Sequence, residues 1–266
     1  MISKLGLALL ISLALAGCGE KKEAVQGTGA NAKPSPASLM NSPKLPDSPA
    51  PPTAQAPVLP KPDRTLPLAS YVDLNGEAAG LALTYIVSAK AQAPLSDDEK
   101  LSRLSPAYFN ETDAFKKKEV AKAEMPRVDA ALSKYRKHDY YAVPVSAYSR
   151  QPLGLTNVSV GQYDFSTRSF PLASYGQDCW TGTLRNPQGV VLKILQSDIP
   201  CRLPVADEAQ AKLIEAARAQ NALGLQGTLY LFVPRAENGT ALAVVSRAHI
   251  ELINSQTQAP LGSFDL

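Results

Sequence analysis

A long proline-rich segment near the N-terminus limits how much of this chain can fold. Between Glu20 and Leu66 there is no aromatic residue and no isoleucine, whereas proline occurs at positions 34, 36, 43, 46, 49, 51, 52, 57, 60 and 62. Such a segment cannot bury enough apolar surface to offset the entropy lost on folding. The core must therefore come from the roughly 200 residues that follow, enough for one domain without additional cross-links.

The proline-rich segment is best interpreted as a stalk. We expect residues 18–66 to separate the N-terminus from a single globular domain at 67–266. The stalk would reach on the order of 140 Å if fully polyproline-like, and roughly 40 Å as a flexible coil. Such a segment can also be a ligand for a proline-reading partner, and that alternative stays open.

The first residues have the composition of an export signal. Lys4 precedes an apolar run from Leu5 to Ala16, and small residues follow before Cys18. The run is about 12 residues long, whereas a membrane-spanning helix needs roughly 20. We therefore expect residues 1–17 to be removed as a signal peptide.

The four residues Leu15-Ala16-Gly17-Cys18 resemble the lipobox of bacterial lipoproteins, in which the chain is cut before an acylated cysteine. The resemblance implies lipidation of Cys18 and attachment to the membrane through that lipid. Each buried methylene of the acyl chains would contribute roughly 0.8 kcal/mol, so the anchor would be effectively permanent. The residue after the cysteine is Gly19 and not the aspartate that would keep a lipoprotein in the inner membrane. By this resemblance the protein is expected in the outer membrane, facing the periplasm. The alternative is an ordinary signal peptide with a chance cysteine.

The two remaining cysteines, Cys179 and Cys201, form an even pair in an oxidising compartment. A disulfide is the default expectation there, and closing a loop of about 20 residues would contribute roughly 3 kcal/mol. Trp180 directly follows Cys179. Packing in the core is favoured for Trp180 over a role as an exposed binding anchor.

Helical patterns occupy the first part of the expected domain. Asp73 is a candidate N-cap for an amphipathic helix whose apolar positions recur at steps of four, three and four: Leu74, Ala78, Leu81 and Tyr85. A capping box at Ser96 and an N-cap before Pro106 predict two short helices. A longer helix is expected within 110–137, kinked or split by Pro126, with an apolar face of Phe115, Met125, Val128, Leu132 and Tyr135.

After His138, β-branched and aromatic residues predict strands, in the ranges 140–148, 155–165, 169–172, 180–184 and 190–196. The stretch 186–189 is a turn between the last two. A helix is expected at 207–222, with Leu213 and Ile214 on its apolar face, followed by strands at 227–233 and 240–253. The predicted fold class is α+β: N-terminal helices, then a largely antiparallel sheet with one inserted helix.

Few residues suggest chemistry. Ser159 lacks one of the two glycines of a nucleophile elbow. His138 lies at a helix-to-strand junction, where a helix dipole explains it as well as acid/base catalysis does. His249 is expected to face water in a strand beside Arg247 and Glu251.

Other site types also lack support. The cluster Asp97, Asp98 and Glu99 lacks the alternating ligands and central glycine of a calcium loop. No glycine-rich phosphate loop occurs, and Lys plus Arg exceed Asp plus Glu by only three. We therefore predict no catalytic residue, no metal ligand, no cofactor and no nucleic-acid partner.

Three short segments are similar to an uncharacterised family of proteobacterial lipoproteins of unknown function. They are Glu111–Lys117, Tyr163–Phe165 with Phe170, and Asp207–Ala209 leading into the helix around Ile214. The resemblance covers the chain from about Tyr71 onward. It implies an envelope location and a fold, and it brings no activity and no functional residue.

The leading functional hypothesis is a non-enzymatic binding or structural module in the cell envelope, held on its stalk near an envelope protein or peptidoglycan. One alternative is a periplasmic hydrolase of envelope polymer acting through Asp97, Asp113 or Asp164; two carboxyl groups about 5 to 10 Å apart in a pocket would favour it. Another is an accessory lipoprotein of a pilus or secretion assembly.

Overall fold

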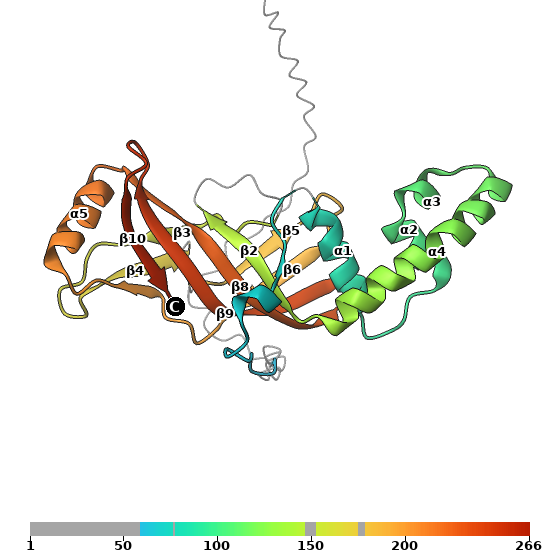
Figure 1. Ribbon diagram of the computed structural model, residues 1–266, viewed down its shortest axis with the longest axis horizontal. Helices are drawn as coiled ribbons and strands as arrows, with labels where there is room; N and C mark the ends of the chain where they lie inside the picture. Colours follow the sequence, from blue (N-terminus) through green and yellow to red (C-terminus); the bar gives the residue numbers. More distant parts are fainter. Residues whose placement is uncertain (1–58, 77, 147–152, 175–178) are drawn as a thin grey trace, which may run out of the picture. The chain divides into compact units, whose positions relative to one another are not determined.

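The computed structural model describes residues 59–76, 78–146, 153–174 and 179–266. The expected signal peptide, Cys18 and the stalk up to residue 58 lie outside these residues. The described part is an α+β fold, which confirms the predicted class: helices come first, then a mixed sheet with one inserted helix (Figure 1). Within this part, no helix has both the length and the apolar character needed to cross a membrane.

The helices and strands keep the labels of Figure 1. The helical elements are η2 (Leu68–Ser70), α1 (Ala79–Ala89), α2 (Asp97–Leu104), α3 (Pro106–Asn110), α4 (Ala114–Lys137) and α5 (Glu208–Ala219). The strands are β1 (Val72–Asp73), β2 (Tyr140–Ser146), β3 (Val158–Val160), β4 (Ser169–Ser174), β5 (Gly182–Arg185), β6 (Val191–Leu195), β7 (Arg202–Pro204), β8 (Leu223–Glu237), β9 (Thr240–Asn254) and β10 (Pro260–Asp265).

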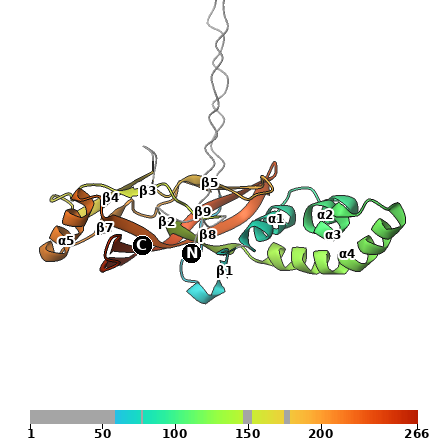
Figure 2. The ribbon, with the colours of Figure 1, turned by 90° about the horizontal axis from the view of Figure 1, so that it is seen from above.

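The main sheet has the strand order β1-β2-β8-β9-β6-β5, and β10 also pairs with β9. Most of its pairs are antiparallel, and the exceptions are β1 with β2 and β6 with β9. Strands β3, β4 and β7 form a second, three-stranded sheet. Figure 2 shows this small sheet and α5 at one end of the main sheet and α2, α3 and α4 at the other. The sequence patterns had not predicted β1, β7 or β10.

Two hydrophobic clusters divide the described residues. The larger one, which we call the sheet body, joins the main sheet, the small sheet, α5 and one face of α1. The smaller one belongs to α2, α3 and α4, residues 97–137, which we call the helical lobe. Helix α1 serves both clusters, because Leu83 and Ile86 pack into the body whereas Tyr85 and Ala89 pack into the lobe.

Helix α1 begins later than the sequence pattern indicated. Asp73 is not its N-cap but part of β1, and its carboxylate accepts a hydrogen bond from the Asn75 amide at 2.9 Å. Leu74 is buried ahead of the helix, where its amide donates to the Ala142 carbonyl. Leu81, expected on the buried face, is 39% exposed. Pairing with β2 keeps this segment extended, so a tertiary contact overrides the local helical spacing.

The starts of α2 and α3 were predicted correctly, whereas the start of α4 lies four residues after the start of the range 110–137. Ser96 and Glu99 form the capping box of α2, and Ser105 caps α3 with Pro106 in the first turn. Asp113 caps α4, which continues as one helix through Pro126 and is not split there. Phe115 was placed on the apolar face of this helix, but it is 84% exposed because it precedes the first contact with the lobe's hydrophobic cluster.

The folded region begins before residue 67. The Asp63 amide donates to the Tyr140 hydroxyl at 2.8 Å, and Arg64 forms an ion pair with Asp198 beyond the end of β6. Residues 59–66 had been assigned to the stalk because of their proline content. Their contacts with the sheet body make them part of the folded region instead.

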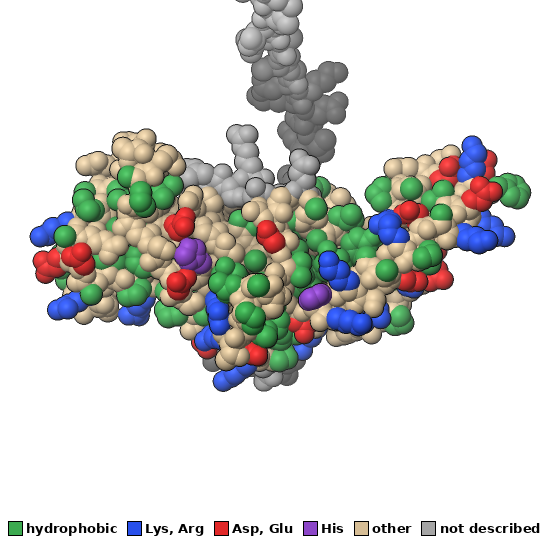
Figure 3. Space-filling model, viewed as in Figure 1, with side chains coloured by type: hydrophobic (Ala, Val, Ile, Leu, Met, Phe, Trp, Pro, Cys, Tyr) green, Lys and Arg blue, Asp and Glu red, His purple; other side chains and the backbone are tan. Residues whose placement is uncertain are grey.

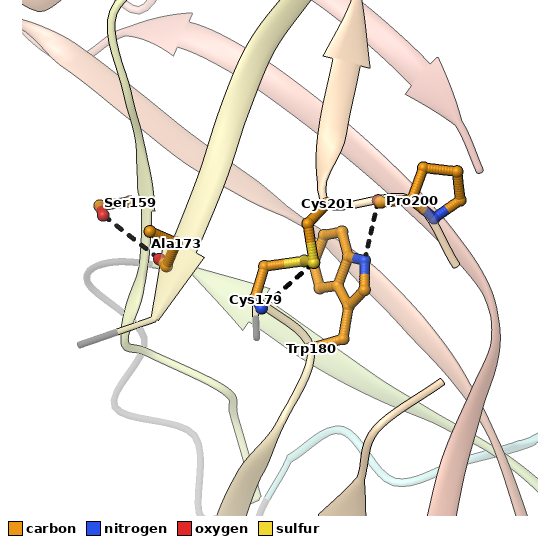
Figure 4. The surroundings of a disulfide bond; sticks show 6 residues. All are labelled: Ser159, Ala173, Cys179, Trp180, Pro200 and Cys201. Atoms are coloured by element: carbon orange, nitrogen blue, oxygen red, sulfur yellow. Dashed lines mark hydrogen bonds between the residues drawn. A yellow bond between two sulfur atoms is a disulfide. The ribbon is translucent and has the colours of Figure 1, made fainter. Parts of the chain in front are cut away.

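Cys179 and Cys201 are joined by a disulfide, with their Cα atoms 5.6 Å apart. Trp180 lies beside it, 2% exposed, and its indole N–H donates to the Pro200 carbonyl at 3.1 Å (Figure 4). The indole therefore packs in the core, as favoured from the sequence, with its one polar atom satisfied. In the same view the Ser159 hydroxyl donates to the Ala173 carbonyl.

Candidate functional site

A groove of about 640 Å³ opens where α1 and the helical lobe meet two turns of the main sheet. It is lined from α1 by Leu81, Thr84, Val87 and Ser88, from the lobe by Ser102, Arg103, Pro106, Phe109 and Asn110, and from the turns by Gln188, Gly189, Val190 and Gly239. Figure 3 shows hydrophobic side chains gathered on the surface where α1 approaches the lobe. A volume of this size lies within the range of small-molecule and peptide sites, about 300–1,000 Å³.

Asn186 fixes one wall of the groove. This buried side chain donates to the Gly80 carbonyl at 2.6 Å and to the Thr84 hydroxyl at 2.9 Å, and it accepts from the Val190 amide at 2.8 Å. Pro187 packs against Gly80, and a Cβ atom added to Gly80 would lie 3.4 Å from Cδ of Pro187. The β5–β6 turn is thereby fastened to α1.

The opposite wall depends on the packing of the lobe. Tyr85 of α1 donates its hydroxyl hydrogen to the Leu104 carbonyl at 3.3 Å and accepts from Arg127 of α4 at 3.2 Å. The Ser105 hydroxyl donates to Glu124 at 2.9 Å. Hydrogen bonds from Arg127 and then Ser105 lower the pKa of the Glu124 carboxyl. These bonds join α1, α2, α3 and α4 beneath the groove.

Two apolar side chains of the groove are exposed to water. Leu81 is 39% exposed and Phe109 is 68% exposed. Exposure of a phenylalanine ring leaves apolar area in contact with water that a ligand would cover favourably. The groove therefore offers an apolar contact that the protein itself does not use.

Four neutral polar side chains of the groove have no hydrogen-bond partner among the described residues: Ser88, Ser102, Asn110 and Gln188. The contact between Arg103 and Glu99 is long, with Nη2 of Arg103 lying 3.9 Å from Oε1 of Glu99. The other carboxylate oxygen of Glu99, Oε2, accepts from the amide and hydroxyl of Ser96 at 2.9 and 2.8 Å, and these bonds lower the pKa of Glu99. No carboxylate lines the groove, so its described lining combines neutral donors and acceptors with one cation.

Comparison with known families, curated proteins and solved structures gives no match for this chain. The lipobox and the similarity to a lipoprotein family of unknown function stay predictions from the sequence. The groove therefore has to be interpreted from its own chemistry.

The three carboxylates considered for a hydrolase lie on different elements, and each is engaged locally. Asp97 pairs with Lys100 at 3.0 Å, and Asp113 accepts from two amides at the start of α4. Asp164, in the β3–β4 turn, accepts from Ser166 and Thr167, which lower its pKa to about 2. None of the three lines the groove. In the described ranges, no cluster of His, Cys, Asp and Glu side chains is placed to hold a metal ion.

The two histidines lie apart from the groove. His138 follows the last residue of α4, and its carbonyl accepts from the Tyr141 hydroxyl at 2.8 Å. His249 is part-exposed on β9, with Nδ1 2.7 Å from Asp265 and Nε2 3.5 Å from Glu251. Hydrogen bonding to Asp265, and then the charges of both carboxylates, raises the pKa of His249. Asp265 was not foreseen as a partner because β10 was not predicted.

None of the residues that build the groove was predicted from the sequence to have a functional role, and Leu81 and Pro106 were named there only as helix positions. Asn186 had been recognised only as part of a turn, although asparagine in a turn commonly bonds to nearby backbone. Phe109 and Arg103 carry no motif at all. A weak signal existed in Phe109, since a large apolar residue directly after a buried position of a five-residue helix cannot share its buried face.

Proposed function

We propose that this chain is a lipid-anchored lipoprotein of the bacterial outer membrane, facing the periplasm, and that it is a non-enzymatic binding module. Its groove receives another component of the envelope. The observation that carries this proposal is the groove's lining, in which an exposed Phe109 ring lies among four polar side chains that have no partner in the described part of the chain. Such a surface is complementary to a ligand and is unused within the chain.

The location is supported by two independent features. The residues Leu15-Ala16-Gly17-Cys18 match the lipobox at every position, and a proline-rich stretch follows them. The disulfide between Cys179 and Cys201 is typical of proteins that fold outside the cytoplasm. An anchor followed by a long tether suits a module whose partner lies at a distance from the membrane.

The groove can be tested by site-specific photocrosslinking in cells. A photoreactive amino acid in place of Ser102 or Gln188 should yield a discrete adduct, because both side chains line the groove and neither bonds to another described residue. The matched control is Ser263, an exposed residue of β10. Adducts from the groove positions alone support the proposal. Equal adducts from all three positions, or none from the groove, contradict it.

The anchor is tested separately by mass spectrometry of the mature protein. The N-terminal residue should be Cys18 carrying a diacylglyceryl group and an amide-linked acyl chain. A Cys18→Ala form should keep residues 1–17 and carry no acyl mass, because the modified thiol is required for cleavage. A mature chain that starts elsewhere, or an unmodified Cys18, would show that the signal is an ordinary one.

A further inference from the structure

The lining of the groove restricts which envelope component it suits. Asn110 and Gln188 present planar amides, and Ser88 and Ser102 present hydroxyl groups, all without partners among the described residues. A purely apolar ligand would cover these groups and leave them unsatisfied, at a cost for each. A ligand whose own polar groups bond to these side chains is therefore favoured over a purely apolar helix or an acyl chain.

Charge restricts the ligand further. Among the described residues that line the groove, Arg103 is the one that carries a charge, and its contact with Glu99 is long, at 3.9 Å. The guanidinium thus keeps donors for a carboxylate, which it prefers to bind through two parallel hydrogen bonds. A basic peptide would face this cation with no carboxylate in the lining to offset it. A single cation is also too few for a nucleic-acid backbone.

A chain of amino sugars satisfies all of these features together. A pyranose ring has one face of C–H groups, which packs on an exposed aromatic ring such as Phe109, 68% exposed at the rim. Its hydroxyl and acetamido groups exchange hydrogen bonds with amides such as Asn110 and Gln188. Carboxylates of an attached peptide complement Arg103.

We infer that the groove binds peptidoglycan, an N-acetylated amino-sugar strand that carries acidic peptides. This inference rests on the proposed function, because it names the ligand of the same groove. The stalk predicted from the sequence suits such a partner, because a polyproline-like segment extends by ~3.1 Å per residue. An amino-sugar strand of peptidoglycan would extend beyond the groove on both sides, so the groove would contact only a short part of it.

The test uses the detergent-solubilised full chain and two probes. Purified peptidoglycan sacculi measure binding by co-sedimentation, and soluble disaccharide-peptide fragments measure affinity by calorimetry. Phe109→Ala and Gln188→Ala should each weaken binding about tenfold or more, because each removes a direct contact with the ligand. Arg103→Glu should weaken binding of the acidic fragments but leave the binding of an uncharged N-acetylglucosamine oligomer unchanged.

Matched control variants distinguish specific binding at the groove from non-specific binding elsewhere on the surface. Phe165 is 83% exposed in the β3–β4 turn, and Arg202 is exposed on β7; Phe165→Ala and Arg202→Glu should bind like the unmodified chain. Trp180 fluorescence and circular dichroism verify that every variant is folded. An equal loss in the control variants would overturn the assignment of the ligand to the groove.

The failure of this inference can be told from the failure of the proposed function. If neither sacculi nor fragments bind while a crosslinker at Ser102 still captures one envelope protein, the ligand is a protein and the inference is wrong. The binding-module proposal then stands. If neither probe binds and the groove positions give no adduct, both are wrong.

Discussion

In the helical lobe, the side chains that cap the helices come from residues adjacent in sequence: Ser96 and Glu99 for α2, Ser105 for α3 and Asp113 for α4. In the sheet body, the contacts join residues far apart, as in the disulfide between Cys179 and Cys201 and the pairing of β2 with β8. The lobe also has its own small hydrophobic cluster, which α1 connects to the body.

The groove lies at the boundary between the helical lobe and the sheet body. One wall comes from the lobe, and the other comes from α1 and the turns of the sheet. Neither hydrophobic cluster covers its apolar rim. The stability of each region can therefore be varied separately, and the resulting change at the groove shows how closely the two are coupled.

The largest loss of stability is expected from Gly227→Ala in the sheet body. Gly227 has φ of +152°, and a Cβ atom there would lie 2.0 Å from the His249 carbonyl oxygen of the paired strand. Relief requires β8 and β9 to separate, so we expect a cost of about 4 kcal/mol or more in denaturant unfolding. Gly239→Ala in the same hairpin is the control: φ is +75° with nothing within 4 Å, so the cost should be about 1–2 kcal/mol.

Leu104→Ala should weaken the lobe more than the body. Leu104 is fully buried in the lobe's cluster, and truncating such a leucine costs about 2–5 kcal/mol. Trp180, the one tryptophan of the chain, reports on the body, whereas circular dichroism at helical wavelengths reports chiefly on the lobe. The helical transition should move to lower denaturant further than the fluorescence transition does. Identical shifts would mean that the two regions unfold as a single cooperative unit.

Removing the disulfide should destabilise the sheet body more than the helical lobe. Cys179→Ser combined with Cys201→Ser opens a loop that spans 22 positions, at a cost of about 3 kcal/mol in the loop-closure model. The Trp180 transition should shift and the helical transition should shift less, because neither cysteine belongs to the lobe's cluster. Reductant should lower the melting temperature of the unmodified chain and leave that of the double variant unchanged.

Asn186→Ala tests the junction between the regions. It removes three hydrogen bonds and leaves the Gly80 carbonyl, the Thr84 hydroxyl and the Val190 amide without this partner. A cost of about 1–3 kcal/mol is expected, together with weaker binding at the groove because its wall is released. The control on the same turn is Gln188→Ala, because that side chain forms no hydrogen bond within the residues that the structure describes; its unfolding free energy should stay within about 0.5 kcal/mol of the original. A comparable loss of unfolding free energy in both variants would argue against Asn186 as the residue that holds the turn to α1.

The lobe was predictable because its signals are local. Ser96 with Glu99, and Ser105 with Pro106, show their helix starts within four residues of sequence. The start of α1 was wrong because parallel pairing of Val72 and Asp73 with β2, nearly seventy residues later, decides it. Strand β10 was missed for a related reason. Its alternation is weak over Pro260–Asp265, and only pairing with the completed β9 makes it a strand.

The candidate site was even less predictable than the fold. Its lining comes from three helices and two turns that lie up to 158 positions apart, from Leu81 to Gly239. Sequence patterns indicate chemistry where reactive residues cluster along the chain, whereas the polar part of this lining is two serines, a threonine, an asparagine, a glutamine and one arginine among apolar residues and glycines. Such residues are indistinguishable from ordinary surface until the fold shows that they converge and lack partners.

The smallest effect is expected from pH at the β9–β10 pair of the sheet body. The raised pKa of His249, caused first by its hydrogen bond to Asp265, means that folding favours the protonated ring. The stabilisation is therefore present below the unfolded pKa of about 6.5 and is lost as pH rises through the higher folded pKa. Because the ring is 35% exposed and its partners face water, we expect under about 1 kcal/mol. His249→Gln should flatten this part of the stability profile measured between pH 5.5 and 8.5. It should leave the helical transition of the lobe unchanged at every pH, since neither His249 nor Asp265 belongs to that cluster. A pH-dependent shift of the lobe that disappears in His249→Gln would instead couple the two regions through the sheet.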